Sequence, residues 1–393
     1  MEVQSYISQS DMEFDTLKHQ LKQAPLYLEV RERDDLFALM FSDASPKDSS
    51  LIRQCVGPIF DKASKTLCSY SLDLAHEILI NQEDPDWTDL NNMNLNSTKV
   101  TEYVEGIKLT VFFHKKWRIS TTRNIDAYHG YWCSPRSFAT MFMETCKVLF
   151  PEIHAQIEGA HPEGPLSTQC SYVFVLSHPE HHCLQEILNP SLIHIATFDL
   201  QNFKYVSQDI GVPKQAYLIF SSVDALKENL QNSSTHHPGY ILEGTDDAKW
   251  SRTRLVTLAY KRLQELRGND PDLYRHYLNV RQSSNESLEQ LIHLIPRFRA
   301  IQWYLESQIH ELARAIHDLY IAFFVKRYAR PHLDKTLFVT LMQLHNDYKA
   351  SHVKRTRAIV YDHVSSLPTA LLYRLLTNTR YGTYGDEPQG AYE

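Results

Sequence analysis

The hydrophobic residues of this chain change their spacing once, near Asp270, and that change restricts the folds that the chain can adopt. Before it, apolar and polar residues alternate over short stretches, which is the two-residue period of half-buried strands. Such stretches occur at residues 26–31, 108–113, 117–120 and 172–176. The first part of the chain is therefore predicted to form sheets of short strands.

Beyond Asp270, apolar residues recur every three or four positions, as they do on one face of a helix. Ser283 and Glu286 have the spacing of a capping box, which predicts that a helix begins there. The stripe that follows consists of Ile301, Leu305, Ile309, Leu312, Ile316, Leu319 and Phe323. We predict an α+β domain over residues 1–270, an all-α domain over residues 271–380 and a disordered tail over residues 381–393.

The composition is that of an ordinary globular protein. The chain has 393 residues, 43% of them hydrophobic, and a formal net charge of -7. A membrane helix needs an apolar run of about 18 residues, and the best candidate, residues 320–325, is far shorter. The N-terminus is acidic and lacks the apolar stretch of a secretory signal. We therefore expect an intracellular, cytoplasmic protein that is not secreted and has no membrane partner.

The six cysteines argue against a disulfide framework and against a zinc site. They lie far apart and include no pair separated by two residues, which is the spacing of a zinc knuckle. Their positions are Cys55, Cys68, Cys133, Cys146, Cys170 and Cys183. We expect reduced thiols, and we predict no metal site from the sequence.

Four segments in the first 270 residues resemble the motifs of one enzyme family. The most informative segment is TEYVEGIKLTVFFHKKWRISTTRNIDA, residues 101–127, in which an acidic-Gly pair opens a strand and a two-lysine turn leads to a second strand. Residues 53–73, 171–184 and 239–268 supply an Arg-Gly-like pair, a Phe-Glu-Leu-like strand and a Glu-Gly strand in the same order. Together the four segments resemble the phage T4-type RNA ligase 1 family of covalent nucleotidyltransferases. The resemblance implies an adenylation domain of antiparallel sheets with flanking helices, followed by a helical domain.

Aligning the motifs shows that this chain lacks the residues on which the family's chemistry depends. In that family, a lysine two residues before the acidic-Gly pair attacks the α-phosphate of ATP, and other charged residues contact the phosphates. The position of the nucleophilic lysine is occupied by Tyr103. The other positions that depart from the pattern are Val56, Val175, Arg254 and Val256. Valine cannot stabilise charge on a phosphate, so the resemblance implies a degenerate member with no catalytic residues.

Other residues of the aligned motifs are still able to contact a nucleotide. The resemblance assigns this role to Glu105, Gly106, Arg123, Glu243 and Arg254. An alternative for each carboxylate is a purely structural, hydrogen-bonded position at a strand end.

Two lysines near Tyr103 are candidates for a substitute nucleophile. Lys108 lies an odd number of residues away and would point to the opposite face of a regular strand. Lys99 has the right parity but lies roughly 13 Å away along an extended chain. Neither is predicted to replace the missing amine, although an alignment error of one or two residues would change this conclusion.

The helical domain carries a local excess of positive charge. Residues 322–357 contain eight Lys or Arg and two Asp, and 8 − 2 gives +6 in a chain whose total is -7. Tyr328 and Tyr348 lie among these charges, and aromatic rings beside cations can stack on bases. The sequence predicts an RNA- or polyanion-binding face that includes Lys326, Arg327, Arg330, Lys354, Arg355 and Arg357. An ordinary solvated helical surface is the alternative.

The sequence leaves three functions open. The first is an RNA ligase-like protein that has lost adenylyltransfer and serves as a binding or structural component of a larger assembly, for example a virus particle, with protein partners and no cofactor. The second is an active, divergent ATP-dependent RNA ligase or related nucleotidyltransferase that uses ATP and Mg²⁺, with Tyr103 or an unrecognised lysine as the nucleophile. The third is a protein that binds ATP as a structural ligand without any chemistry.

Overall fold

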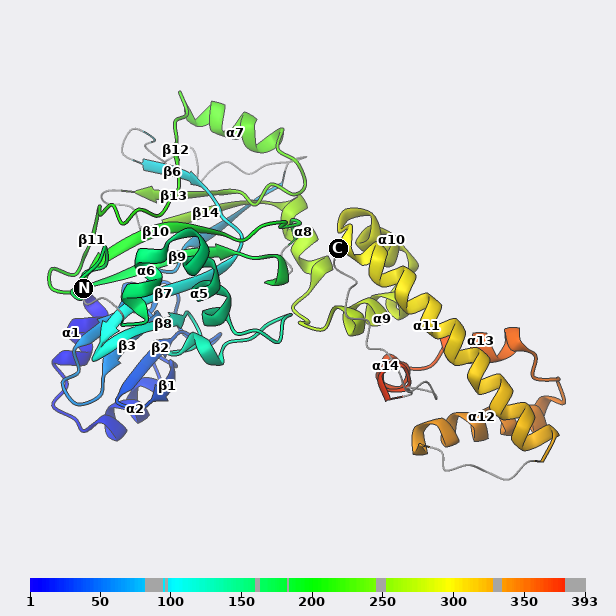
Figure 1. The fold of residues 1–393 in the computed structure, drawn as a ribbon. Coiled ribbons are helices and arrows are strands. Elements are labelled where there is room, and N and C mark those ends of the chain that lie inside the picture. The colour runs from blue at the N-terminus through cyan, green and yellow to red at the C-terminus, as the bar shows by residue number, and fades with distance from the viewer. Residues whose placement is uncertain are drawn as a thin grey trace. The chain divides into compact units, whose positions relative to one another are not determined.

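The computed structural model describes residues 1–81, 95, 98–159, 163–181, 184–244, 252–327 and 334–378. The chain folds into two compact units, Met1–Gln264 and Glu265–Glu393. Sheets and short helices make up the first unit, and helices make up the second (Figure 1). The predicted α+β class with antiparallel sheets and a C-terminal helical region is confirmed. The predicted tail, residues 381–393, lies outside the described residues.

The first sheet of the N-terminal unit has four antiparallel strands in the order β1-β2-β3-β4. Its strands are β1 (Glu29–Arg33), β2 (Leu36–Met40), β3 (Val56–Asp61) and β4 (Leu67–Ser69), and its helices are α1 (Glu2–Ser8), α2 (Phe14–Lys22) and α3 (Ser50–Arg53). Leu17, Leu21 and Phe37 are fully buried between helices and sheet. The strand predicted at residues 26–31 begins only at Glu29, because Tyr27 has a φ of 50° and its amide bonds back to the carbonyl of Gln23 in a turn.

The second sheet has five antiparallel strands in the order β11-β10-β9-β7-β8. The strands are β7 (Ile107–His114), β8 (Lys116–Thr121), β9 (Cys170–Ser177), β10 (Ser191–Asp199) and β11 (Lys204–Val206). The strands predicted from alternation at residues 108–113, 117–120 and 172–176 are confirmed as parts of β7, β8 and β9. Helices α5 (Phe138–Leu149) and α6 (Pro151–Ile157) cover one face, and Leu109, Tyr172 and Phe174 are fully buried in this core (Figure 1).

The third sheet also has five strands, in the order β12-β6-β13-β14-β5. The strands are β5 (His76–Ile80), β6 (Thr98–Glu102), β12 (Tyr217–Leu218), β13 (Tyr240–Gly244) and β14 (Arg252–Thr257). Only β14 and β5 are parallel among the described pairs. One face packs against helix α7 (Val223–Gln231) through Val100, Leu242, Leu255, Leu226 and Leu230. The other face of the sheet carries most of its charged residues, and it lines the candidate site.

The C-terminal unit is helical, as predicted. Its helices are α8 (Leu258–Arg267, which begins in the first unit), α9 (Leu273–Ser283), α10 (Asn285–Leu294), α11 (Arg297–Tyr320), α12 (Lys335–Ser351), α13 (Arg357–Ser365) and α14 (Thr369–Asn378). A π-helical turn, Ile321–Val325, continues α11 directly. In the first unit, 3-10 turns lie at Ala127–His129 and Pro179–His181. Five residues of the predicted stripe on α11 are buried, from Ile301 to Ile316. The predicted capping box is wrong by one residue: Ser283 ends α9, and Ser284 caps α10 by accepting a hydrogen bond from the amide of Ser287.

A carboxylate near the centre of α11 links three helices of this unit. Glu306 accepts a hydrogen bond from Arg281 Nε at 2.6 Å and another from the hydroxyl of Tyr277 at 3.0 Å, both on α9. The hydroxyl of Tyr361 on α13 also donates to it at 3.5 Å. A partly buried charge with this number of partners holds the helices in one register. Among the described helices, none is both long enough and apolar enough to cross a membrane.

Candidate functional site

The charged face of the third sheet is assembled by strand register. Cross-strand partners in a sheet project to the same side, so each row of paired residues forms a line across one face. One row contains Lys99, Glu243 and Arg252, and the next contains Thr101 and Arg254. The residues between these rows belong to the core under α7. The polar rows therefore face away from α7.

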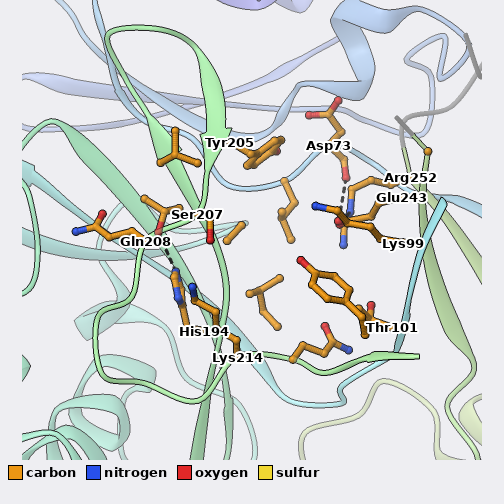
Figure 2. A pocket seen from close by; sticks show the side chains of 18 residues that line it. Asp73, Lys99, Thr101, His194, Tyr205, Ser207, Gln208, Lys214, Glu243 and Arg252 are labelled. Carbon is orange, nitrogen blue, oxygen red and sulfur yellow. Dashed lines mark hydrogen bonds and ion pairs between the residues drawn. The ribbon is translucent and has the colours of Figure 1, made fainter. Parts of the chain in front are cut away.

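These polar rows line a cavity of about 370 Å³ (Figure 2). Its other wall comes from β10, β11 and the segment that follows them. The polar lining residues include Asp73, Lys99, Thr101, His194, Ser207, Gln208, Lys214, Glu243 and Arg252, and Leu72, Ile195 and Tyr205 supply apolar surface. A volume of this size is typical of pockets for small organic ligands.

Arg252 is fixed within the cavity by two contacts. Its Nε donates to Glu243 Oε1 at 2.9 Å, and one terminal nitrogen lies 3.5 Å from the carbonyl oxygen of Asp73. Lys99 lies on the same side of the cavity, whereas His194 and Lys214 lie on the opposite side (Figure 2). Three cations, Lys99, Lys214 and Arg252, thus outnumber the carboxylates of Asp73 and Glu243 in the lining. This balance favours an anionic ligand.

His194 contributes a neutral polar group to the cavity at neutral pH. Its side chain is buried, and its Nε2 lies 3.0 Å from the hydroxyl of Thr197. Burial disfavours the imidazolium and lowers the pKa of His194 from 6.5 to about 4, with the positive charge of Lys214 contributing.

We expect acid to destabilise the protein through His194. Below pH 6.5 the unfolded state binds a proton at this residue and the folded state does not, so stability falls as the pH drops from about 6.5 towards about 4. The full loss is ~3 kcal/mol for a shift of this size. Urea unfolding at several pH values should show this slope in the wild type and a shallower one in His194→Gln. An equal slope in both proteins would contradict the assignment.

Tyr103, at the position of the missing lysine, lies in the loop that follows β6. Its ring is half-buried, and Arg254 Cζ lies 3.8 Å from the ring centroid, which is a cation–π contact. The Tyr103 amide donates to the carbonyl of Gly239 at 2.9 Å. Arg254 also contacts Glu77 Oε2 at 3.4 Å, and this carboxylate neutralises its charge. Arg254 therefore contacts both the Tyr103 ring and the Glu77 carboxylate.

Glu105 and Gly106 complete this loop and enter β7. The Glu105 carboxylate accepts a hydrogen bond from the amide of Leu184 at 3.1 Å. Burial raises the pKa of Glu105, although hydrogen bonds from backbone amides and Tyr260 oppose the shift. A Cβ at Gly106 would lie 2.5 Å from the carbonyl oxygen of Leu176, so this position needs glycine for close approach of two strands. One oxygen of Glu105 thus makes the hydrogen bond that the structural alternative describes, whereas Oε2 is buried without a hydrogen-bond partner among the described residues, and ligand contact by Glu105 stays a prediction.

Lys108 departs from the parity expectation. Residues 103–106 are not strand, so the chain passes from the third sheet to the second and a two-residue period does not relate Tyr103 to Lys108. Lys108 pairs with Val175 on the face opposite the α5 core. Burial lowers the pKa of Lys108 to about 8, and the charge of Arg252 adds to the shift. Within the described part of the chain, the Lys108 amine makes no hydrogen bond or ion pair.

The remaining predicted residues are scattered. Val175 is buried beside Gly106, and Val256 is fully buried on β14. Val56 pairs with Met40 in the first sheet, outside the cavity lining. Arg123 lies on an exposed turn, 3.6 Å from Glu29, and does not line the cavity either. Glu243 is the only one of the five predicted nucleotide contacts among the lining residues.

Three cations line this cavity without having been predicted to do so: Lys99, Arg252 and Lys214. Arg252 was detectable, since it lies two residues before Arg254 on the same strand and must share its face. Val175 and Val256 are buried and do not line the cavity, and these three cations keep the cavity polar.

The predicted basic residues of the C-terminal unit lie at the ends of α11, α12 and α13. Lys326, Arg327 and Lys354 are exposed. Arg355 donates to Ser351 Oγ at 2.9 Å, and Arg357 lies 3.8 Å from Asp318. Arg330 lies outside the described residues.

An aromatic stack accompanies these charges. The rings of Phe324 and His345 stack with centroids 3.9 Å apart and planes 12° apart, and Tyr348 continues the stack at 6.2 Å from His345. Tyr348 is 38% exposed. The second predicted stacking residue, Tyr328, lies outside the described residues.

Comparisons with known proteins give distant relatives. No family model matches the chain. It is 23% identical over 346 residues to an immediate-early protein ICP-46 homolog of Invertebrate iridescent virus 6, covering 80% of this chain and 72% of the relative. It is 24% identical over 225 residues to the homolog of Invertebrate iridescent virus 3, of which it spans about half (53% of this chain, 48% of the relative).

Solved structures similar to this chain include ligases. A putative ATP-dependent DNA ligase from Aquifex aeolicus matches with a TM-score of 0.42 and 15% identity, covering 92% of this chain and 98% of that one. An archaeal ATP-dependent RNA ligase matches with a TM-score of 0.39 and 10% identity, covering 93% and 81%. Likeness at this level does not establish a shared function.

Proposed function

We propose that this protein binds a nucleoside triphosphate in the cavity between its second and third sheets and does not form a covalent bond to it. It then acts as a binding or structural component of a larger assembly rather than as a ligase. The observation that carries the proposal is the Tyr103–Arg254 contact: an aromatic ring occupies the nucleophile position, and the nearest cation is stacked on that ring.

The cavity offers a partner for each part of a nucleotide. Lys99, Lys214 and Arg252 supply positive charge for phosphates, and the planar guanidinium of Arg252 suits bidentate contact with phosphate oxygens. The carboxylate of Asp73 can accept hydrogen bonds from sugar hydroxyls. Glu243 is already paired with Arg252, so Mg²⁺ would enter with the triphosphate and not through this carboxylate alone.

The absence of a covalent step follows from the groups around Tyr103. An adenylylating lysine attacks as a free amine, and Tyr103 offers a phenol hydroxyl in place of that amine. Arg254 is committed to the Tyr103 ring and to Glu77, so it is not free to stabilise charge on a transferring phosphate.

The test is calorimetric titration of the protein with ATP and with adenosine. ATP should bind and adenosine should bind at least tenfold more weakly, because the three cations contact phosphates. Arg252→Met should weaken ATP binding by about tenfold or more, the size expected for loss of one charged hydrogen-bonding partner. Arg31→Met, on β1 and outside the cavity lining, is the matched control and should bind like the wild type. Equal binding by Arg252→Met and the wild type would refute this site.

One observation favours a second function, an active and divergent nucleotidyltransferase. Lys108 lies on the face of the second sheet opposite the α5 core, and its pKa of about 8 leaves a fraction of its amine unprotonated at neutral pH. In this reading Lys108, not Tyr103, would attack the α-phosphate. Covalent labelling of the protein by ATP separates the two functions.

We propose that the C-terminal unit binds single-stranded RNA. The support is the exposed Tyr348 end of the Phe324–His345–Tyr348 stack, together with the exposed Lys326 and Lys354, which lie two and six residues from the stack in sequence. Affinity for an RNA oligonucleotide should fall steeply with salt. Replacing both lysines by Gln should reduce the magnitude of the log–log salt slope by about 1.4, at ~0.7 per phosphate contact with a single strand. Lys47→Gln, in the first unit, should leave the slope unchanged, and an unaltered slope in the double variant would refute this face.

A further inference from the structure

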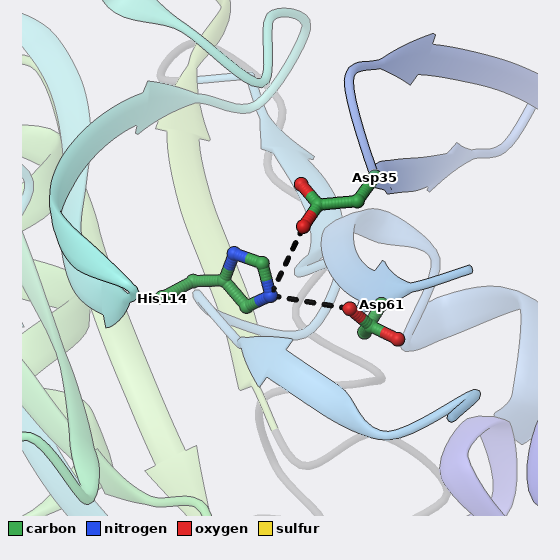
Figure 3. A group of neighbouring side chains, drawn as sticks. All are labelled: Asp35, Asp61 and His114. Carbon is green, nitrogen blue, oxygen red and sulfur yellow. Dashed lines mark hydrogen bonds and ion pairs between the residues drawn. The ribbon is translucent and has the colours of Figure 1, made fainter. Parts of the chain in front are cut away.

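Three strand ends of the N-terminal unit bring two carboxylates and an imidazole together, away from the cavity. Asp35 follows the tight turn after β1, in which Asp34 has a φ of 51°. Asp61 is the last residue of β3, and His114 is the last residue of β7. All three side chains point towards one another (Figure 3). Anchoring on regular strands gives each group a fixed position.

The distances among these groups match those between ligands of one ion. His114 Nε2 lies 3.2 Å from Asp61 Oδ2 and 3.8 Å from Asp35 Oδ2, and the three ligand atoms all lie within 4.8 Å of one another. Two ligand atoms at about 2.1 Å from a common metal ion lie roughly 3.0 to 3.4 Å apart at octahedral or tetrahedral angles. Small side-chain movements would bring the three atoms to that separation.

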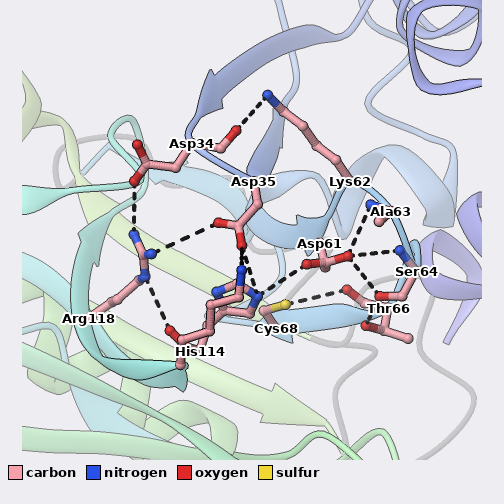
Figure 4. A network of polar contacts seen from close by, with 11 residues as sticks. Asp34, Asp35, Asp61, Lys62, Ala63, Ser64, Thr66, Cys68, His114 and Arg118 are labelled. Carbon is pink, nitrogen blue, oxygen red and sulfur yellow. Dashed lines mark hydrogen bonds and ion pairs between the residues drawn. The ribbon is translucent and has the colours of Figure 1, made fainter.

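A second layer of hydrogen bonds orients the carboxylates. Asp61 Oδ1 accepts hydrogen bonds from the amides of Ala63 and Ser64 at 3.0 and 2.8 Å and from the Ser64 hydroxyl at 2.9 Å, which leaves Oδ2 directed at His114 (Figure 4). Arg118 lies 4.0 Å from Asp35 Oδ1, so the other oxygen of Asp35 faces the centre. Outer partners that fix the inner ligands in this way are characteristic of metal centres.

An exposed lysine, Lys115, lies beside the position that an ion would take. Lys115 contacts Asp35 Oδ2, the same oxygen that faces His114. The Lys115 side chain is 70% exposed, whereas the His114 side chain is 12% exposed. An ammonium on a flexible, exposed stem can leave at little cost, while the three ligand residues remain in place.

We propose that Asp35, Asp61 and His114 form a binding site for a divalent transition-metal ion, which displaces Lys115 from Asp35. The site is separate from the cavity proposed to bind nucleotide, and it does not depend on that proposal. One imidazole and two carboxylates form a ligand set that is neither hard nor soft. Such a set binds Zn²⁺ more tightly than Mn²⁺ in the usual order of divalent affinities. Mg²⁺ prefers oxygen ligands alone and should bind least well.

The experiment is calorimetric titration of the metal-free full-length protein with ZnCl₂. Asp61→Asn and His114→Gln should each remove one equivalent of Zn²⁺ binding that the wild type shows, and Lys115→Met should bind that equivalent several-fold more tightly because the competing ammonium is gone. Asp34→Asn is the matched control, since Asp34 is in the same turn but outside the triad, and it should retain the wild-type equivalent. Co²⁺ should give a visible absorption band that His114→Gln loses.

The Lys115→Met variant keeps the test decisive even where removal of a ligand disturbs the fold. Misfolding cannot tighten binding, so a gain in affinity in this variant supports the site directly. Circular dichroism checks that Asp61→Asn and His114→Gln retain the wild-type spectrum. The proposal is overturned if the wild type lacks this equivalent, if the ligand variants keep it, or if Lys115→Met binds no more tightly than the wild type.

Discussion

Replacing Gly239 by alanine should destabilise the N-terminal unit by about 3 kcal/mol or more. Gly239 has a φ of 93°, which L residues rarely adopt, and a Cβ there would lie 1.9 Å from the carbonyl oxygen of Leu255. Backbone strain and overpacking each cost roughly 1–3 kcal/mol, and here they coincide. Relief would require β13 and β14 to separate at the residue pair Tyr240–Leu255, the end pair of the ladder between these two strands.

Gly159→Ala is the matched control for this prediction. Gly159 has a φ of 80°, but nothing lies within 4 Å of a Cβ built there, so it carries the backbone strain without the steric clash. It should cost about 1 kcal/mol. Urea unfolding followed by circular dichroism measures both variants. A free energy of unfolding that falls equally in both would show that the Leu255 contact does not constrain the chain.

Local pattern predicted much of the fold. The stretches assigned a two-residue period identified β7, β8 and β9. One face of β7 and of β8 is buried under α5 and α6, whereas β9 is buried on both faces from Cys170 to Leu176. The three- and four-residue stripe identified α11, and five of its eight buried residues are predicted ones. Prediction was wrong at element ends, at Tyr27 and at Ser283, where turns and a preceding helix determine the boundary.

The site was harder to predict than the fold, because it forms between elements that are distant in sequence. His194 and Lys214 face Arg252 across the cavity through sheet pairing and loop placement that no local pattern contains. The orientation of Lys108 depends on residues 103–106, where the chain leaves the third sheet and enters the second. Counting residues along one strand cannot predict such a change of sheet. The contact between Tyr103 and Arg254 was likewise not predicted, because the motif alignment named both positions without placing them relative to each other.

The second large expected effect is the complete absence of covalent adenylylation. The protein should bind ATP reversibly, yet incubation with Mg²⁺ and ATP radiolabelled on its α-phosphate should leave no label on the protein after acid denaturation. The reason is that Tyr103 replaces the amine and that Arg254 is held by the Tyr103 ring and by Glu77. Tyr103→Phe and Lys108→Met, examined in parallel, should behave like the wild type in this assay.

This labelling assay tests most directly whether the protein binds ATP without forming a covalent adenylate. The account predicts calorimetric ATP binding together with an unlabelled protein band. A labelled, acid-stable band in the wild type would contradict it, and the variants would then identify the nucleophile: loss of label in Lys108→Met assigns the lysine, and loss in Tyr103→Phe assigns the tyrosine.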